Sequence, residues 1–220
     1  MIVYKLKIKL LSDTTFGRGD GVAGLVDQEV EHDNYGFPYL RGRTLKGLLS
    51  EECDNLIAVL LPDDIRQHWE LVASRLFGNP GSTLNTIAQM HVGDACLPED
   101  LRQVVAHQMK RRDNNLNRVD ILESLTTMRR QTAIDPKTGT PDKKSLRSSR
   151  VILRELEFTA HLSFEVQPDD DALTLLSVGG LALRRVGSGR NRGRGYVQCR
   201  LFDTTDTEIT GNFLHRFGKK

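Results

Sequence analysis

The chain has 220 residues, 38% of them hydrophobic and 27% charged, a composition typical of a soluble globular protein and unlike that of a disordered or fibrous one. Its three cysteines are widely separated, which argues against a disulfide framework or a thiolate zinc site. Its formal net charge is only +2, and no stretch approaches the roughly 18 to 20 apolar residues of a membrane helix. We therefore expect a single soluble domain over residues 1–220, cytoplasmic and without a membrane partner.

The chain opens with a strand pattern over residues 2–10. Apolar residues at the even positions alternate with Lys5, Lys7 and Lys9, which is the period of a β-strand with one buried face. The lysine row is either an ordinary solvated face or a nucleic-acid surface. Residues 12–43 follow as a long, glycine-rich first loop, and loops of this length in compact domains are often functional.

The middle of the chain is expected to be mostly helical. A leucine stripe with Thr44 as N-cap predicts a helix over 44–60. The Gly-Asn-Pro-Gly run at 78–81 ends a second predicted helix over 64–77. The remaining predicted elements are a strand over 87–97 and helices over 98–110 and 119–128, so that residues 98–128 form a helical insertion.

The segment at 129–150 carries seven basic and two acidic side chains, a net charge of +5. Its centre, Asp-Pro-Lys-Thr-Gly-Thr-Pro-Asp at 135–142, has turn-forming chemistry, which predicts a protruding hairpin. Alternating apolar residues then predict a strand over 151–166, with Arg154 as the exception on the apolar face. Three aspartates open a predicted helix over 169–185, where they complement the positive helix N-terminus.

Residues 187–195 read Gly-Ser-Gly-Arg-Asn-Arg-Gly-Arg-Gly and lie between this helix and a last predicted strand over 196–202. Glycine lets the backbone approach a ligand closely, and guanidinium groups bind phosphate oxygens in pairs of hydrogen bonds. The pattern predicts a phosphate-binding loop, with RNA as the expected polyanion; a flexible, solvated turn is the alternative. The candidate contacts are Gly187, Gly189, Arg190, Arg192, Gly193, Arg194 and Gly195.

Without its insertions, the predicted order is strand, helix, strand, strand, helix, strand. Ferredoxin-like domains and RNA-recognition modules share this order. We therefore predict an α+β fold with a ferredoxin-like (RRM-like) βαββαβ core, extended by the first loop, the helical insertion and the hairpin. The aromatic residues with which RNA-recognition sheets stack bases are not evident, so contacts from loops to phosphates are expected instead.

Three segments, in order, resemble one protein family. Residues 21–47 carry an aspartate, a later acid, a Gly-x-Pro and a Gly-x-Thr-Leu-Lys-Gly helix start. Leu-Phe-Gly at 76–78 precedes a strand and Asp94, and 187–195 supplies a C-terminal glycine-rich loop. Together they are similar to the RAMP proteins that form the backbone of type III CRISPR–Cas effectors, and residues 129–135 look most like the III-D branch.

The resemblance implies a filament subunit that holds CRISPR guide RNA and stacks on copies or paralogues of itself. The hairpin at 129–150 would be a thumb that inserts between the guide and target RNA, while base pairing reads the target sequence. RNA contacts are expected near a helix start and on the thumb, with solvated surface charge as the alternative. These candidates are Arg41, Arg43 and Lys46, and on the thumb Arg129, Arg130, Lys143 and Lys144.

In catalytic members of the family an aspartate of the first loop is needed to cut target RNA, and the matching residue here is Asp27. The attacking group would be a ribose 2′-hydroxyl, with Asp27 as general base or as holder of a divalent cation, Mg²⁺ or Mn²⁺. Glu31 and Asp33 are candidate helpers. A turn carboxylate without catalytic role is the alternative for Asp27.

The predicted function is thus that of a type III effector subunit that binds guide RNA and cleaves paired target RNA. Its expected partners are guide RNA, target RNA and other CRISPR effector subunits. Three alternatives remain at this point: a structural subunit without activity, a CRISPR RNA-processing endoribonuclease in which His32 acts as acid or base, and an unrelated ferredoxin-like domain with a phosphate ligand.

Overall fold

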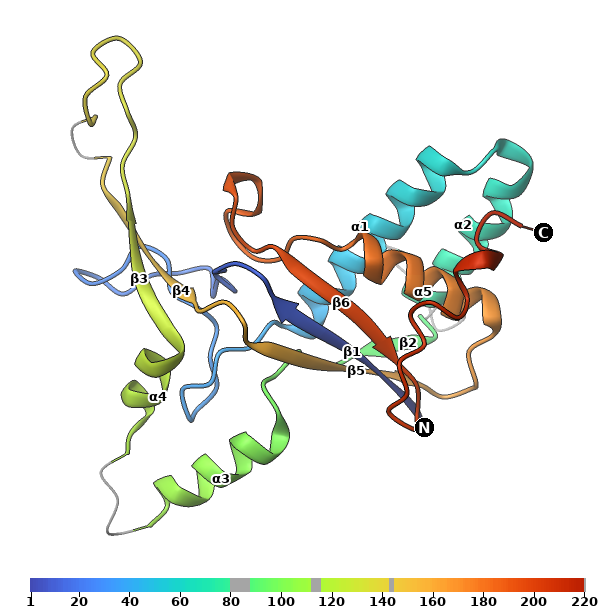
Figure 1. The fold of residues 1–220 in the computed structure, drawn as a ribbon, viewed down its shortest axis with the longest axis horizontal. Coiled ribbons are helices and arrows are strands. Elements are labelled where there is room, and N and C mark those ends of the chain that lie inside the picture. Colours follow the sequence, from blue (N-terminus) through green and yellow to red (C-terminus); the bar gives the residue numbers. More distant parts are fainter. Residues whose placement is uncertain (80–87, 112–115, 143–144, 220) are drawn as a thin grey trace.

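The computed structural model describes residues 1–79, 88–111, 116–142 and 145–219, which leaves the predicted contacts Lys143 and Lys144 outside the described residues. The fold is α+β, as predicted, with a four-stranded antiparallel sheet in the order β2-β5-β1-β6 and a separate two-stranded sheet, β3-β4 (Figure 1). The strands are β1 (Ile2–Leu10), β2 (Met90–Val92), β3 (Thr126–Gln131), β4 (Arg147–Ile152), β5 (Glu157–Phe164) and β6 (Val197–Phe202).

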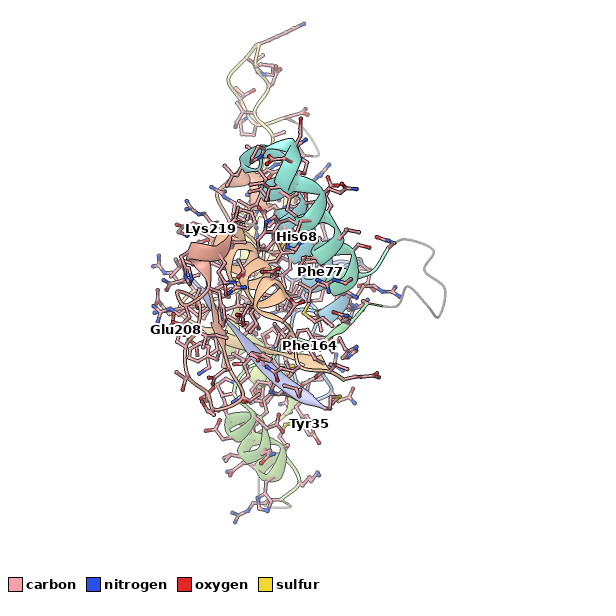
Figure 2. The ribbon with its side chains drawn as sticks, turned by 90° about the vertical axis from the view of Figure 1, so that its right-hand side faces the viewer. Tyr35, His68, Phe77, Phe164, Glu208 and Lys219 are labelled. Atoms are coloured by element: carbon pink, nitrogen blue, oxygen red, sulfur yellow. The ribbon has the colours of Figure 1, made fainter. Side chains whose placement is uncertain are left out.

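Three helices cover one face of the four-stranded sheet: α1 (Gly42–Leu60), α2 (Asp63–Phe77) and α5 (Asp170–Ala182). Figure 2 shows His68 and Phe77 on this helical layer. The helices α3 (Glu99–Met109) and α4 (Arg118–Leu125) lie away from it, and the β3–β4 hairpin projects from the same end of the molecule as α4 (Figure 1). None of the described helices is both long and apolar enough to cross a bilayer.

The core lies between this sheet and its helical layer. Alternate residues of β1 and β5 point into it, among them Ile8 and Phe158, which are completely buried. They pack with buried leucines of α1 and α5 and with Trp69 of α2, which is completely buried. Burying one such aliphatic or aromatic side chain stabilises a fold by roughly 1.5–3 kcal/mol. The packed layers therefore form a rigid base from which the loops extend.

The opposite face of the sheet carries the lysine row. Lys5 and Lys7 both pair with Asp206, at 3.1 and 3.5 Å between nitrogen and oxygen, and Lys9 pairs with Glu155 at 2.9 Å. Each lysine therefore has a carboxylate partner, and the two carboxylates neutralise two of the three lysine charges. This pairing favours the interpretation of the row as a solvated face over that of a nucleic-acid surface.

The predicted helix start at Thr44 is wrong, because α1 already begins at Gly42. Its cap comes from far away in the sequence: the Asp94 carboxylate accepts a hydrogen bond from the Gly42 N–H at 2.7 Å. At Gly42 the backbone lies against the Val92 carbonyl so closely that a Cβ atom has no room. A cap supplied by a distant loop leaves no local signal at the helix start.

Two other predicted elements extend across breaks in the structure. The helix predicted over 119–128 ends at Leu125, because the chain continues from Thr126 as β3, paired with β4. The single strand predicted over 151–166 is divided between β4 and β5 by residues 153–156, where Glu155 adopts a left-handed φ of 71°. The alternation of apolar residues continues on both sides of this break, which conceals it in the sequence.

Of the strand predicted over 87–97, residue 87 lies outside the described residues, and within 88–97 the strand is confined to Met90–Val92. Beyond it, the chain continues only as isolated bridges at Ala95 and Cys96. The predicted helices over 64–77, 98–110 and 169–185 are confirmed apart from their ends. Two of these helices have local signals at one end, which is why the sequence predicts them. Gly78 takes a φ of 76° directly after α2, and the Asp169 side chain accepts a hydrogen bond from the Ala172 N–H at the start of α5.

The contact between α1 and α5 gives a stability prediction. A Cβ atom at Gly179 would collide with the Cys53 sulfur, whereas a Cβ at the neighbouring Gly180 would lie 3.6 Å from Leu6 Cδ1, an ordinary contact. Gly179→Ala is therefore expected to lower the free energy of unfolding by about 1–3 kcal/mol through overpacking. Gly180→Ala is the matched control and is expected to raise it by about 0.4–1 kcal/mol. Urea unfolding checks both, and equal effects of the two variants would contradict the assignment.

Candidate nucleic-acid interface

The glycine/arginine loop at 187–195, together with the preceding Val186, is hydrogen-bonded to the first loop. The Thr14 hydroxyl donates to the Val186 carbonyl at 2.8 Å, Ser188 N–H donates to the Thr15 carbonyl at 2.8 Å, and Gly195 N–H donates to the Asp13 carbonyl at 3.0 Å. The loop glycines Gly187, Gly189, Gly193 and Gly195 all have φ between 74° and 81°, the left-handed region that favours glycine. These contacts argue against a free, flexible turn.

This fastening gives a prediction about two neighbouring glycines. A Cβ at Gly195 would collide with the Val186 carbonyl, while the space around Gly193 is open. Gly193→Ala should cost only the left-handed backbone, about 1–2 kcal/mol of unfolding free energy. Gly195→Ala should cost about 1–3 kcal/mol more, because it adds the collision. Thermal and urea unfolding measure the difference, and a Gly195→Ala variant no less stable than Gly193→Ala would show that the loop is not fastened in this way.

The loop and the base of the hairpin line one hollow of about 340 Å³, which we call the arginine groove. It brings together two basic segments that are distant in the sequence, 187–195 and 129–150. Its lining residues are Ser12, Asp13, Arg129, Arg130, Gln131, Arg154, Arg192, Gly193 and Arg194. With five arginines and one aspartate, the lining is strongly positive on a nearly neutral protein.

Most of the positive charge in the arginine groove is free to meet an anion. Asp13 pairs with Arg129, at 2.6 Å, and accepts a hydrogen bond from the backbone N–H of Arg154. The other guanidinium groups, those of Arg130, Arg154, Arg192 and Arg194, form no ion pair with any residue that the structure describes. Unpaired guanidinium groups that converge on one hollow suit the bidentate binding of phosphate oxygens.

Arg41 and Arg190 lie outside the arginine groove. They line a neighbouring hollow of about 220 Å³ at the start of α1, together with Gly187. Arg41 pairs there with Glu31 at 2.6 Å, and Arg190 pairs with Glu51 at 3.4 Å. Both charges are thus balanced within the chain, although the hollow adjoins the glycine/arginine loop.

Arg43 and Lys46 are also separate from the arginine groove. They line a hollow of about 570 Å³ between α1 and α2, which also contains the carboxylates of Asp54 and Glu70. Partial burial lowers the pKa of the Lys46 ammonium group. The sequence placed these residues in one phosphate-binding set with the glycine/arginine loop, and the structure divides that set between different hollows.

The first loop holds six acidic side chains, five of which are ion-paired. Asp27 is the exception and pairs with no basic side chain in the described ranges. The five pairs are Asp13 with Arg129 (2.6 Å), Asp20 with Arg18 (2.6 Å), Glu29 with Arg150 (2.9 Å), Glu31 with Arg41 (2.6 Å) and Asp33 with Arg102 (3.2 Å). The structure therefore singles out the same aspartate that the family resemblance indicates.

Asp27 is held by Ser148 of β4. Its Oδ2 atom accepts hydrogen bonds from the Ser148 N–H at 2.6 Å and from the Ser148 hydroxyl at 3.1 Å. The Asp27 N–H donates in return to the Ser148 carbonyl at 3.0 Å. These bonds, helped by the nearby charge of Arg147, hold the pKa of the Asp27 carboxyl below its usual range. Because a stronger acid is a weaker base, Asp27 is better suited to holding a cation than to removing a proton.

Asp27 lines a hollow of about 460 Å³ formed by residues 21–27 and Ser148. No group of three or more metal-binding side chains occurs among the residues described, so Asp27 would supply one carboxylate to a divalent cation. Mg²⁺ commonly binds one or two carboxylates and completes its shell with water and substrate phosphates. The residues present therefore fit a cation that binds together with RNA.

Glu31, Asp33 and His32 are not brought to Asp27 as helpers. None of them lines its hollow, and both carboxylates are ion-paired elsewhere. The His32 ring contacts the Asp33 carbonyl at 3.1 Å and an Arg118 guanidinium nitrogen at 3.4 Å. The expectation that Glu31 or Asp33 assists Asp27 is therefore wrong, because each completes a different contact.

Sequence reasoning missed Asp13, Ser148 and Arg154 as site residues. Arg154 left a signal: it interrupts the apolar face of the predicted strand, and such an interruption indicates either a break in the strand or a functional charge. Asp13 and Ser148 left none, because an aspartate or serine in a loop or on an exposed strand is common. Their roles depend on contacts with residues more than a hundred positions away.

Comparisons with known proteins identify a family and a common fold. The family model of the RAMP superfamily matches residues 7–198. A chain from a cryo-EM structure of the type III-B Cmr-beta bound to cognate target RNA matches with a TM-score of 0.64 and 12% identity, over 94% of this chain and 98% of that one. A chain from the apo state of type III-B Cmr-beta matches with a TM-score of 0.63 and 13% identity, over 91% and 97%. No curated protein sequence matches. At these identities the structural matches show a common fold.

Proposed function

Because the chain belongs to the RAMP superfamily, we propose that it is an RNA-binding subunit of a type III CRISPR effector whose arginine groove holds guide-RNA phosphates. The observation that carries the proposal is the convergence of the glycine/arginine loop and the hairpin base on one positive hollow. A single-stranded RNA backbone offers repeated anionic groups to such a hollow without the need to read bases.

The proposed subunit has a ferredoxin-like core and a thumb. The antiparallel order β2-β5-β1-β6 supports the core, and the projecting β3–β4 hairpin supports the thumb (Figure 1). The thumb separates guide from target RNA, and the partners are these two RNAs and further effector subunits. The structural matches come from type III-B particles, and the III-D subtype stays a prediction from residues 129–135.

We further propose that the subunit cuts target RNA at Asp27. The ribose 2′-oxygen attacks the adjacent phosphorus, the bond from phosphorus to the 5′-oxygen breaks, and a 2′,3′-cyclic phosphate and a 5′-hydroxyl result. The 2′-proton leaves to water, and the departing 5′-oxygen takes a proton from water. A divalent cation, when bound, neutralises charge that develops on the phosphate. The role of Asp27 is to hold that cation at the target phosphate through a carboxylate that stays ionised.

The test of the proposed function is purification of the assembled particle, with sequencing of its RNA and mapping of target cuts. We expect CRISPR guide RNA, and affinity that falls steeply with salt as phosphate counterions are released. Guide RNA without any target cutting would support the purely structural subunit. Metal-independent cutting of a repeat hairpin would support the processing enzyme, and a particle without RNA would overturn the proposal.

A further inference from the structure

The first loop is joined to β4 of the thumb hairpin by backbone hydrogen bonds around an isolated bridge at Gln28. Gln28 N–H donates to the Ser148 carbonyl at 3.3 Å, Arg150 N–H donates to the Gln28 carbonyl at 3.0 Å, and Gln28 forms a parallel bridge with Ser149. One residue further on, Glu29 and Arg150 form an ion pair at 2.9 Å, with side chains only 4% and 10% exposed. Residues 27–29 are thus fixed along β4 by both backbone and buried charge.

Within this junction, the Asp27 carboxylate has one engaged and one free oxygen. Oδ2 is held by two donors of Ser148, whereas Oδ1 has no hydrogen bond to any part of the chain that the structure describes. Asp27 itself is exposed to solvent. An exposed aspartate without such donors turns freely about its side-chain bonds, so its direction depends on Ser148.

We propose that Ser148 is a positioning residue that holds Asp27 in the direction needed for RNA cutting. The inference rests on the proposed role of Asp27. The hydroxyl and the N–H of Ser148 both donate to Oδ2, fix the direction of the carboxylate and leave Oδ1 for the cation. Since Ser148 belongs to β4, the hydrogen bonds that hold Asp27 come from the thumb hairpin itself. Groups that orient a metal-binding side chain in this way commonly change activity by 10- to 100-fold when removed.

The experiment uses particles assembled with guide RNA that carry Ser148→Ala, Ser148→Thr or Ser149→Ala. Ser148→Ala should lower the turnover number for target cutting by about 10- to 100-fold and leave target affinity unchanged. Ser148→Thr keeps the hydroxyl and a side chain suited to a strand, and it should restore most of the rate. Ser149→Ala is the matched control, because the Ser149 side chain has no hydrogen bond within the described chain and should leave the rate unchanged.

Asp27→Asn in the same assay separates failure of this inference from failure of the proposed function. If Asp27→Asn stops cutting but Ser148→Ala cuts at the parental rate, Ser148 does not position the carboxylate. If Asp27→Asn cuts normally, the proposed cleavage itself is wrong. If Ser148→Thr is as slow as Ser148→Ala and Ser149→Ala is equally slow, the effect comes from the strand and not from the hydroxyl, which overturns the inference.

Discussion

A particle with Asp27→Asn will bind guide and target RNA as the parent does and will cut target RNA at least about 100-fold more slowly. Asparagine keeps the size of the side chain and can accept the hydrogen bonds of Ser148, so the loop should keep its position along β4. It has no charge, however, with which to hold a divalent cation at the target phosphate. The cutting rate in single-turnover assays, with target affinity measured on the same particles, separates the two effects.

Asp20→Asn is the control for this result. Asp20 lies in the same loop, is likewise exposed and is ion-paired with Arg18, so it should not be needed for cutting. Cutting by Asp27→Asn at the parental rate would identify the chain as a structural subunit. Equal losses in both variants would mean that loop charge in general, rather than Asp27, supports the reaction.

Replacement of Arg130, Arg192 and Arg194 together by alanine will weaken RNA binding by roughly 100-fold at physiological salt. All three line the arginine groove and form no ion pair within the described ranges. Their replacement therefore removes no ion pair from the folded protein. With each phosphate contact that is lost, fewer counterions are released from the RNA when the protein binds. Each phosphate contact contributes about 0.7 to the slope of log affinity against log salt concentration for a single strand. Loss of three contacts should therefore make this slope shallower by about 2.

The control for the arginine groove removes the same charge elsewhere. Arg75, Arg200 and Arg216 are ion-paired with Asp169, Glu208 and Asp170 on other surfaces. The corresponding triple alanine variant should retain most of the RNA affinity and the parental salt slope. Equal weakening by both triple variants would show that total charge, and not the groove, binds the RNA.

The sequence allowed prediction of the elements whose signals are local. The alternation over residues 2–10 predicted β1, and Gly78 and Asp169 marked one helix end and one helix start. The start of α1 was not predictable in this way, because its cap, Asp94, comes from a different loop. The break at residues 153–156 escaped prediction because two different strands continue the same alternation on either side of it.

For the site, composition indicated the charges but not their arrangement. The glycine/arginine loop and the hairpin base do meet, whereas Arg43 and Lys46, which the sequence grouped with them, line a hollow between two helices. Asp27 was indicated by family resemblance, and its isolation from basic partners emerged only from the structure. Ser148 could not be predicted because hydrogen bonds across 121 positions leave no pattern in a single sequence.

The ion pairs of the lysine row on the outer sheet face affect how the electrostatic potential is distributed over the molecule. Asp206 and Glu155 neutralise two of the three charges of Lys5, Lys7 and Lys9, so that side presents only a weak field to an approaching polyanion. The arginine groove, in contrast, gathers four guanidinium groups that have no ion pair within the described ranges, so positive potential is concentrated there. The proposed RNA partner would therefore be steered toward the arginine groove before contact, and added salt should slow this capture.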